Sequence, residues 1–163
     1  MRKFKKRFVF ALLLMVVGIA SCGGGSDSPT TPSGPVNVSG LWNFDGRLTR
    51  DTCYDLTPGS RFTASITFFQ SGSTVTTRQV DITIGGMNMF FTYRGRVTGN
   101  NLSMAAVDPY VWQDGGSVIH LGSGIDIQNI RNNAGSGSYN LTGQCIQGCT
   151  GSCQTIWTGT WTK

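Results

Sequence analysis

The five cysteines are the residues with the most distinctive chemistry in this chain. Cys145, Cys149 and Cys153 follow one another with three residues between each pair. Thiolates are preferred zinc ligands, so this spacing permits a metal site, although no histidine lies nearby. In an oxidising compartment the same cysteines would form disulfides instead. The compartment of the protein therefore decides between these two chemistries.

Groups suited to catalysis are few. His120 is the only histidine, and the alternation of its segment places it on the solvent side, opposite Ile119 and Leu121. Any catalytic triad must use this histidine, yet no Gly-x-Ser-x-Gly nucleophile motif accompanies it. Asp51 and Asp55 are close in sequence, and a solvated loop accounts for them. We predict no enzyme activity, no catalytic residue, no bound metal and no cofactor.

The N-terminus settles the question of compartment. A basic stretch that ends at Arg7 precedes an apolar run from Phe8 to Ala20, which is the pattern of a secretory signal. The run is shorter than the ~20 residues that a transmembrane helix needs. Export to an oxidising compartment is therefore expected, and with it disulfide bonds.

The end of this signal carries a resemblance. Ile19-Ala20-Ser21-Cys22 resembles the lipobox of bacterial lipoproteins, in which the cysteine receives fatty acyl chains such as palmitate. The resemblance implies that residues 1–21 are removed and that Cys22 anchors the protein to a membrane. Two or more acyl chains are enough to anchor a protein stably in a bilayer. Gly23 stands where an Asp would mark inner-membrane retention, which favours the outer membrane. The alternative is an ordinary signal with Cys22 near its cleavage site.

Removal of the signal changes the charge balance. The chain has 13 Lys and Arg residues against 8 acidic ones, and five of the basic residues lie in the signal. The remainder has a net charge of about zero, with its arginines dispersed. A nucleic acid partner is therefore not expected, because such partners need a basic patch.

Composition also divides the exported part. Residues 22–35 are rich in Gly, Ser, Pro and Thr, and they are predicted to be a solvated tether. Residues 36–163 have the length of one domain with a single core.

Within that domain apolar and polar residues alternate, which is typical of strands with one buried face. A change of phase between Val75 and Val80 predicts a bulge, and Pro109 suits only an edge or an end of a strand. The predicted strands cover residues 38–48, 62–68, 75–84, 89–97, 102–112, 117–131, 138–145 and 154–162. This order predicts an all-β fold, an eight-stranded antiparallel up-and-down β-barrel, because closure removes exposed sheet edges. Its polar outward face predicts a water-soluble barrel.

Two Gly-x-Trp sequences carry a second resemblance. Val38-Ser39-Gly40-Leu41-Trp42 on the first strand and Gly159-Thr160-Trp161-Thr162-Lys163 on the last resemble the calycin superfamily, particularly small bacterial lipocalin-like lipoproteins. The resemblance implies that Trp42 packs at the closed end of the barrel beneath a cation, either Lys163 or Arg131. A second lipocalin motif and a helix after the last strand are missing, so the ligand stays undefined.

Four cysteines remain after Cys22, and two disulfides are expected from them. Three connectivities are possible. Cys53 follows the first strand, whereas the other three surround the connection between the last two strands. We predict one bond between Cys53 and Cys149 and another between Cys145 and Cys153.

The inward positions of the predicted barrel are large and aromatic. An eight-stranded barrel has an interior that side chains just fill or that holds one small ligand, and the sequence leaves both open. The candidate ligand-binding residues are Trp42, Phe91, Tyr93, Tyr139, Trp157 and, at the mouth, Trp112. The expected function is a monomeric, lipid-anchored, non-enzymatic binding module of the bacterial envelope that takes up a small apolar molecule. The alternative is a structural lipoprotein, or one that binds protein or polysaccharide, with a filled core.

Overall fold

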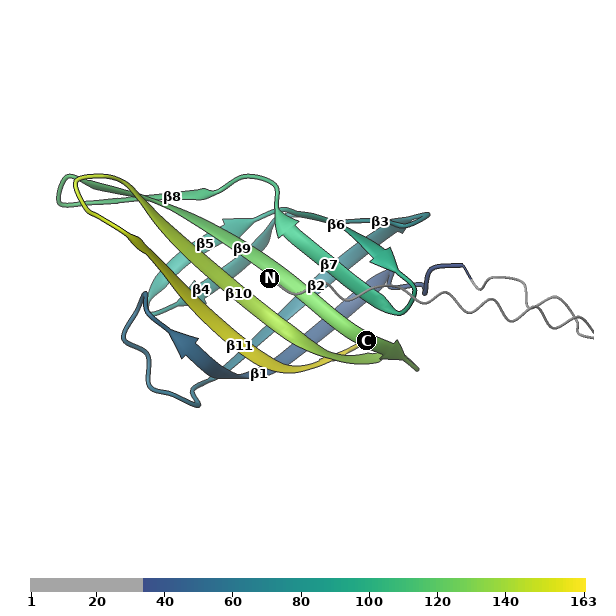
Figure 1. Ribbon diagram of the computed structural model, residues 1–163. Helices are drawn as coiled ribbons and strands as arrows, with labels where there is room; N and C mark the ends of the chain where they lie inside the picture. Colours follow the sequence, from purple (N-terminus) through teal and green to yellow (C-terminus); the bar gives the residue numbers. More distant parts are fainter. Residues whose placement is uncertain (1–33) are drawn as a thin grey trace, which may run out of the picture. The chain divides into compact units, whose positions relative to one another are not determined.

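The computed structural model describes residues 34–163, so the predicted signal, Cys22 and most of the predicted tether lie outside the described residues. The described part contains eleven strands and no α-helix (Figure 1). No helix in this part could cross a membrane. The strands are β1 (Gly40–Asp51), β2 (Arg61–Ser71), β3 (Thr74–Thr77), β4 (Val80–Ile84), β5 (Met87–Phe91), β6 (Tyr93–Thr98), β7 (Asn101–Ala106), β8 (Tyr110–Asp114), β9 (Ser117–Arg131), β10 (Ala134–Gln147) and β11 (Ser152–Thr162).

The strands of the large antiparallel sheet are arranged in a ring. Pairing runs in the order β10, β11, β1, β2, β3, β6, β7 and β9, and β9 also pairs with β10, which joins the two ends of the series. We call these strands the ring. In Figure 1, β9, β10 and β11 pass in front of β2. The predicted all-β, antiparallel architecture is therefore confirmed.

Three long segments of the ring are each broken into two strands. The breaks lie at residues 78–79 between β3 and β4, at Thr92 between β5 and β6, and at 107–109 between β7 and β8. Beyond the breaks, β4 and β5 pair only with each other, and β8 pairs only with β9. The part of the ring on that side therefore has fewer ladder hydrogen bonds.

Two of these breaks follow from the sequence. Thr76 pairs with Arg94, whereas Val80 pairs with Phe91, so the register slips by one residue between the two ladders. This slip is the bulge predicted between Val75 and Val80. Pro109 lies in the third break, in agreement with its exclusion from strand interiors.

The chain connections define two ends of the ring. The loop end carries residues 52–60, the Gly85-Gly86 and Gly115-Gly116 turns, and residues 148–151. The latch end carries the other turns and the segment that leads into β1. All strands of the ring are paired at the latch end, whereas the three breaks affect the loop end.

A glutamine holds the segment before β1 across the latch end. Gln70 accepts a hydrogen bond from the Val38 N–H at 2.7 Å and donates to the carbonyl oxygens of Val36 at 3.1 Å and Gly72 at 2.8 Å. The Trp42 indole N–H donates to the Val38 carbonyl oxygen at 2.8 Å. Val38 is fully buried. These contacts satisfy backbone groups that would otherwise be buried without partners.

Candidate functional site

The interior of the ring is filled by side chains. Trp42, Phe91, Tyr93, Tyr139 and Trp157, predicted as ligand-binding residues, are each at most 2% exposed. They belong to one buried cluster with apolar side chains from every strand of the ring. The sixth predicted ligand-binding residue, Trp112, lies on β8, half-buried against the edge of this cluster. The structure thus places the five buried residues in the core and Trp112 at the loop end.

Three hydroxyl groups form a closed triangle within this core. The Tyr93 hydroxyl lies 2.7 Å from the Tyr139 hydroxyl and 2.8 Å from Ser123 Oγ, and Ser123 Oγ lies 2.9 Å from the Tyr139 hydroxyl. Burial raises the pKa of Tyr93 to about 12 and raises that of Tyr139 well above its usual value. Both phenols are therefore neutral at ordinary pH. Because the three hydroxyls bond to one another, they offer no free donor to a ligand.

Trp42 lies near the start of β1, close to the latch end, and is fully buried. Gly40, two residues earlier, has a φ of +121°, and a Cβ at this position would lie 2.8 Å from Lys163 Cε. The Lys163 side chain therefore covers the Gly40 backbone, near the fully buried Trp42. Arg131, the other cation considered for this position, is exposed at the end of β9.

Two disulfides form, but their pairing differs from the prediction. Cys53 bonds to Cys153, with Cα atoms 5.1 Å apart, and Cys145 bonds to Cys149, with Cα atoms 5.6 Å apart. The predicted Cys53–Cys149 and Cys145–Cys153 bonds are therefore wrong. Both bonds lie at the loop end, and together they occupy the three thiols of the alternative zinc site, Cys145, Cys149 and Cys153.

The register of the strands explains this pairing. Asp51 pairs with Thr155 across β1 and β11, so Cys53 and Cys153, two residues further along, are the next residues to face each other on the same side. On β10 the residue opposite Cys153 is Gly143. Cys153 therefore has no cysteine opposite it on β10. The two remaining cysteines, Cys145 and Cys149, bond to each other at the β10–β11 turn.

Asp51 organises the loop that follows β1. Its carboxylate accepts hydrogen bonds from Thr155 Oγ1 at 2.6 Å, from the Leu56 N–H at 2.7 Å and from the Cys53 N–H at 3.0 Å. Burial alone would raise the pKa of Asp51, but these hydrogen bonds, together with one from the Tyr54 N–H, outweigh burial and lower it. Asp51 therefore stabilises the loop as a charged hydrogen-bond acceptor.

Tyr54, held by this loop, closes the loop end. Its hydroxyl lies 3.9 Å from Met89 Sδ on β5, and a Cβ at Gly85 would lie 3.7 Å from its ring. The side chain is half-buried, and burial raises its pKa. Tyr54 thus covers the core at the loop end, where it connects the loop after β1 to the β4–β5 hairpin.

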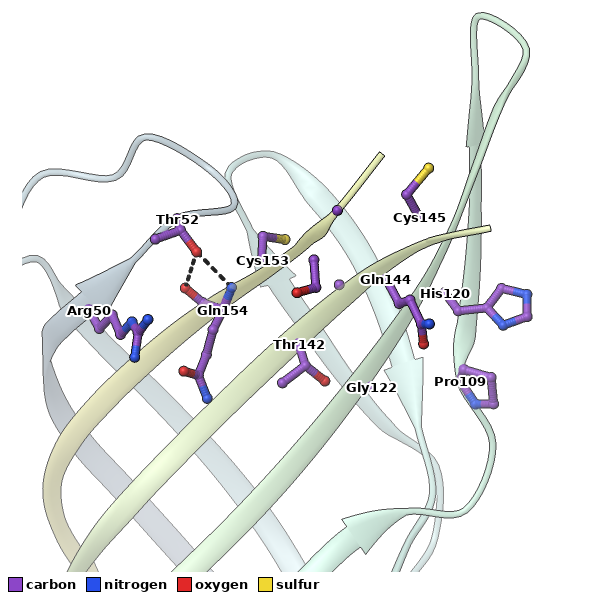
Figure 2. A pocket seen from close by; sticks show the side chains of 13 residues that line it. Arg50, Thr52, Pro109, His120, Gly122, Thr142, Gln144, Cys145, Cys153 and Gln154 are labelled. Carbon is purple, nitrogen blue, oxygen red and sulfur yellow. Dashed lines mark hydrogen bonds between the residues drawn. The ribbon is translucent and has the colours of Figure 1, made fainter. Parts of the chain in front are cut away.

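A groove of about 960 Å³ lies on the outside of the ring. It crosses β1, β11, β10 and β9 close to the loop end. Figure 2 shows Gln154, Thr142 and Gln144 between Arg50 on one flank and His120 with Pro109 on the other. The lining residues are Arg50, Thr52, Pro109, His120, Gly122, Thr142, Gly143, Gln144, Cys145, Gly151, Ser152, Cys153 and Gln154. None of these residues is acidic.

A glycine lies in the floor of the groove where a side chain would stand. A Cβ at Gly122 would lie 2.9 Å from Thr142 Oγ1, so a side chain there would crowd this threonine. Gly143 contributes only backbone to the groove, because a Cβ there would point inward, toward Leu121 and Cys153 Sγ. Thr52 is held in place because its hydroxyl donates to the Gln154 carbonyl oxygen at 3.2 Å and accepts from the Gln154 N–H at 2.8 Å (Figure 2).

The groove suits a polar ligand. Its amide and hydroxyl side chains both donate and accept hydrogen bonds, and the Arg50 guanidinium is a donor that stays charged. Three strand spacings separate β1 from β9, so the groove is ~14 Å wide. No aspartate lines the groove, so His120 has no carboxylate partner there.

Sequence reasoning did not identify the groove, except for His120 as a surface residue. The available signal was Gly122, a glycine inside an otherwise regular strand, where glycine marks a close approach. Comparison of the chain with protein-family models, with curated proteins and with solved structures finds no match. The geometry and chemistry of the described residues therefore carry the functional argument.

Proposed function

We propose that the protein is a non-enzymatic interaction module of the bacterial envelope, held to the outer membrane by acylated Cys22, which binds an anionic polysaccharide in the outer groove. The observation that carries this proposal is the contrast between a filled interior and a polar hollow outside. Uptake of a small apolar molecule is the competing function. It would require displacement of packed side chains such as Trp157 and Tyr139.

The architecture in this proposal is an eight-stranded barrel of the calycin type. Support comes from the breaks in the ring: if β3 with β4, β5 with β6, and β7 with β8 each count as one strand, eight remain. The Gly40-Leu41-Trp42 sequence at the latch end and Lys163 over Gly40 agree with the resemblance. A monomer is proposed, because the ring completes its own core.

Charge argues for an anionic ligand. Arg50 and His120 flank a row of neutral hydrogen-bonding side chains, with no carboxylate between them. Hydroxyl-rich polymers such as polysaccharides match the amide and hydroxyl groups, and a charged donor adds the stronger bonds to an acidic group. The ~14 Å width gives room for a short run of sugar rings.

Binding of oligogalacturonate, an acidic glycan, to the delipidated domain tests this function by calorimetry. Arg50→Gln should weaken binding about tenfold, because one charge-assisted contact is lost. Arg131→Gln is the matched control, since Arg131 is an exposed arginine outside the groove. Equal loss in both variants would indicate nonspecific charge attraction and would overturn the groove as the site.

A fatty-acid probe tests the competing function. The proposal expects no change in tryptophan emission, because Trp42, Trp157 and Trp161 have no space beside them for an acyl chain. Saturable binding with a shift in that emission would favour uptake into the interior and contradict the filled barrel.

A further inference from the structure

The loop end has an opening in its sheet between β5 and β8. β5 pairs only with β4, β8 pairs only with β9, and no ladder joins β5 to β8 among the described strands. The opening begins where the Val107 N–H donates to the Thr92 carbonyl oxygen at 2.8 Å and extends toward the Gly-Gly turns. An unpaired strand edge presents backbone groups that are ready to pair with another chain.

The β4–β5 hairpin determines which backbone groups β5 presents to this opening. Its turn residues, Gly85 and Gly86, have φ values of +59° and +80°, which is the positive pair of a type I′ turn. Residues that flank such a turn exchange both hydrogen bonds, and bonded and non-bonded pairs then alternate along the hairpin. The N–H and C=O groups of Asn88 and Phe90 therefore point away from β4, toward the opening.

The β8–β9 hairpin has the same type of turn and the same alternation of hydrogen-bonded and non-bonded residue pairs. Gly115 and Gly116 have φ values of +55° and +87°. By the same alternation, the N–H and C=O groups of Val111 and Gln113 point away from β9. The opening thus has a row of backbone donors and acceptors on each side. Asn88 and Phe90 supply the row on β5, and Val111 and Gln113 supply the row on β8.

Apolar side chains gather at the same place. Phe90, Val107 and Val111 are 55%, 57% and 47% exposed, and these are three of the six large apolar residues described as exposed. Phe90 packs edge to face on Tyr110, with ring centroids 5.2 Å apart. A hollow of about 370 Å³ is lined by Phe90, Tyr110 and Val111, among other residues. Exposed apolar groups beside unpaired edges indicate an interaction surface.

We propose that an extended segment of a partner polypeptide inserts between β5 and β8 and pairs with both edges as an added strand. Its inward side chains would contact Tyr110 and Trp112, which are only partly buried, so apolar residues are expected at alternate positions. Asp108 lines the hollow and Asp114 ends β8, which favours a basic residue at the end of the segment.

The free edges of β5 and β8 indicate what kind of chain could occupy the opening between them. β5 and β8 lie close together at Phe90 and Tyr110, whose rings are in contact, whereas two strand spacings are ~9.6 Å. A single strand that enters from the Gly-Gly turns must part these two side chains, whereas a folded second copy would bring a whole sheet. The tether of this chain is rich in Gly, Ser and Pro and lacks large apolar residues. A separate polypeptide with an extended, alternating segment fits best, and this proposal does not depend on the polysaccharide groove.

A synthetic peptide in which Val alternates with Thr between terminal Lys residues is the probe, added to the full exported domain with both disulfides formed. Hydrogen exchange should slow at the amides of Val111, Gln113, Asn88 and Phe90. The same peptide N-methylated at alternate residues is its matched control and should bind at least about tenfold more weakly, because it lacks donors along one edge. Acrylamide quenching of Trp112 gives a second readout, since the other three tryptophans are fully buried.

Variants on the protein side complete the test. Val111→Pro removes one N–H from the free edge but none from the β9 ladder, so the fold should persist while binding weakens about tenfold. Val111→Ala retains the N–H and should bind nearly as the parent does. Phe90→Pro tests the opposite edge if Val111→Pro proves unstable.

Several results would overturn the proposal. These are the absence of saturable peptide binding, equal binding by Val111→Pro and Val111→Ala, and protection of residues 61–67 of β2 instead of β5 and β8. This part of β2 also has an unpaired edge, since β3 pairs only with residues 68–71 and β4 pairs only with β5. Protection of the same amides by self-association without peptide, detected by light scattering, would assign the edges to a second copy.

Discussion

The two ends of the ring are stabilised in different ways. At the latch end every strand is paired on both sides, and Gln70 fixes the incoming segment through three hydrogen bonds. At the loop end three strands are broken, and two disulfides, Tyr54 and the Asp51 carboxylate hold the connections together. The groove and the opening between β5 and β8 both lie toward the loop end. Covalent and side-chain contacts there replace ladder hydrogen bonds, and one edge each of β5 and β8 stays unpaired.

Removal of the Cys53–Cys153 bond should have the largest effect on this comparison. Its two cysteines are 100 residues apart in sequence, against 4 for Cys145 and Cys149. The chain-entropy model gives a loss of about 4.7 kcal/mol for Cys53→Ala with Cys153→Ala and about 2 kcal/mol for Cys145→Ala with Cys149→Ala. Urea unfolding of both double variants measures the difference. Equal losses would mean that the loop end does not rely on the longer crosslink.

Gln70→Leu is the corresponding change at the latch end. It removes the acceptor for the buried Val38 N–H and the donor to the Val36 carbonyl oxygen, so a loss of about 2 kcal/mol is expected. Gln128→Leu, at an exposed position on β9, is the matched control and should change stability by less than about 0.5 kcal/mol. Thermal unfolding of both variants provides the comparison, and a neutral Gln70→Leu would show that packing alone holds this end.

The hydroxyl triangle predicts an alkaline transition in the core shared by the two ends. The folded pKa of Tyr93, about 12, is above the unfolded value of about 10, so its contribution is complete below pH 10 and is lost as pH rises toward 12. At pH 11 the loss for this residue is about 1.4 kcal/mol. Tyr93→Phe should show a shallower decline between pH 10 and 12 in urea midpoints. An identical decline would place the titrating group elsewhere.

Asp51→Asn should give the smallest effect, limited to the loop end. The pKa of Asp51 is lowered in the fold, so its contribution is present above the unfolded value of about 4 and is lost as pH falls further. Asn retains one oxygen acceptor, and a loss of about 1 kcal/mol at neutral pH is expected. Hydrogen exchange of the Tyr54 and Leu56 amides at pH 7 and pH 3 measures it. Faster exchange should appear in the variant at pH 7, and the difference from the parent should shrink at pH 3.

Local alternation was sufficient to predict much of the fold. The inward phase of residues such as Phe44, Ile66 and Tyr139 follows from a period of two, and Pro109 marked one strand break. The break at Thr92 left no such signal, because the apolar alternation from Met89 to Val97 continues across it and only the paired strand changes.

Features that depend on register were not predictable in the same way. The disulfide pairing required the knowledge that Asp51 faces Thr155, which no local pattern provides. The groove likewise brings together residues from β1, β9, β10 and β11 that share only an outward phase with other surface residues. Glycines at Gly122 and Gly143 are understandable once their neighbours across the strands are known.

The crosslink between Cys53 and Cys153 has a consequence for proteolysis. It joins the ends of neighbouring strands β1 and β11, so the chain between them forms a covalent loop that contains nine of the eleven described strands. A protease that cuts once in any turn within this loop yields two fragments that stay joined under oxidising conditions. Such a cut would be detected only after reduction, as two bands where the intact protein gives one.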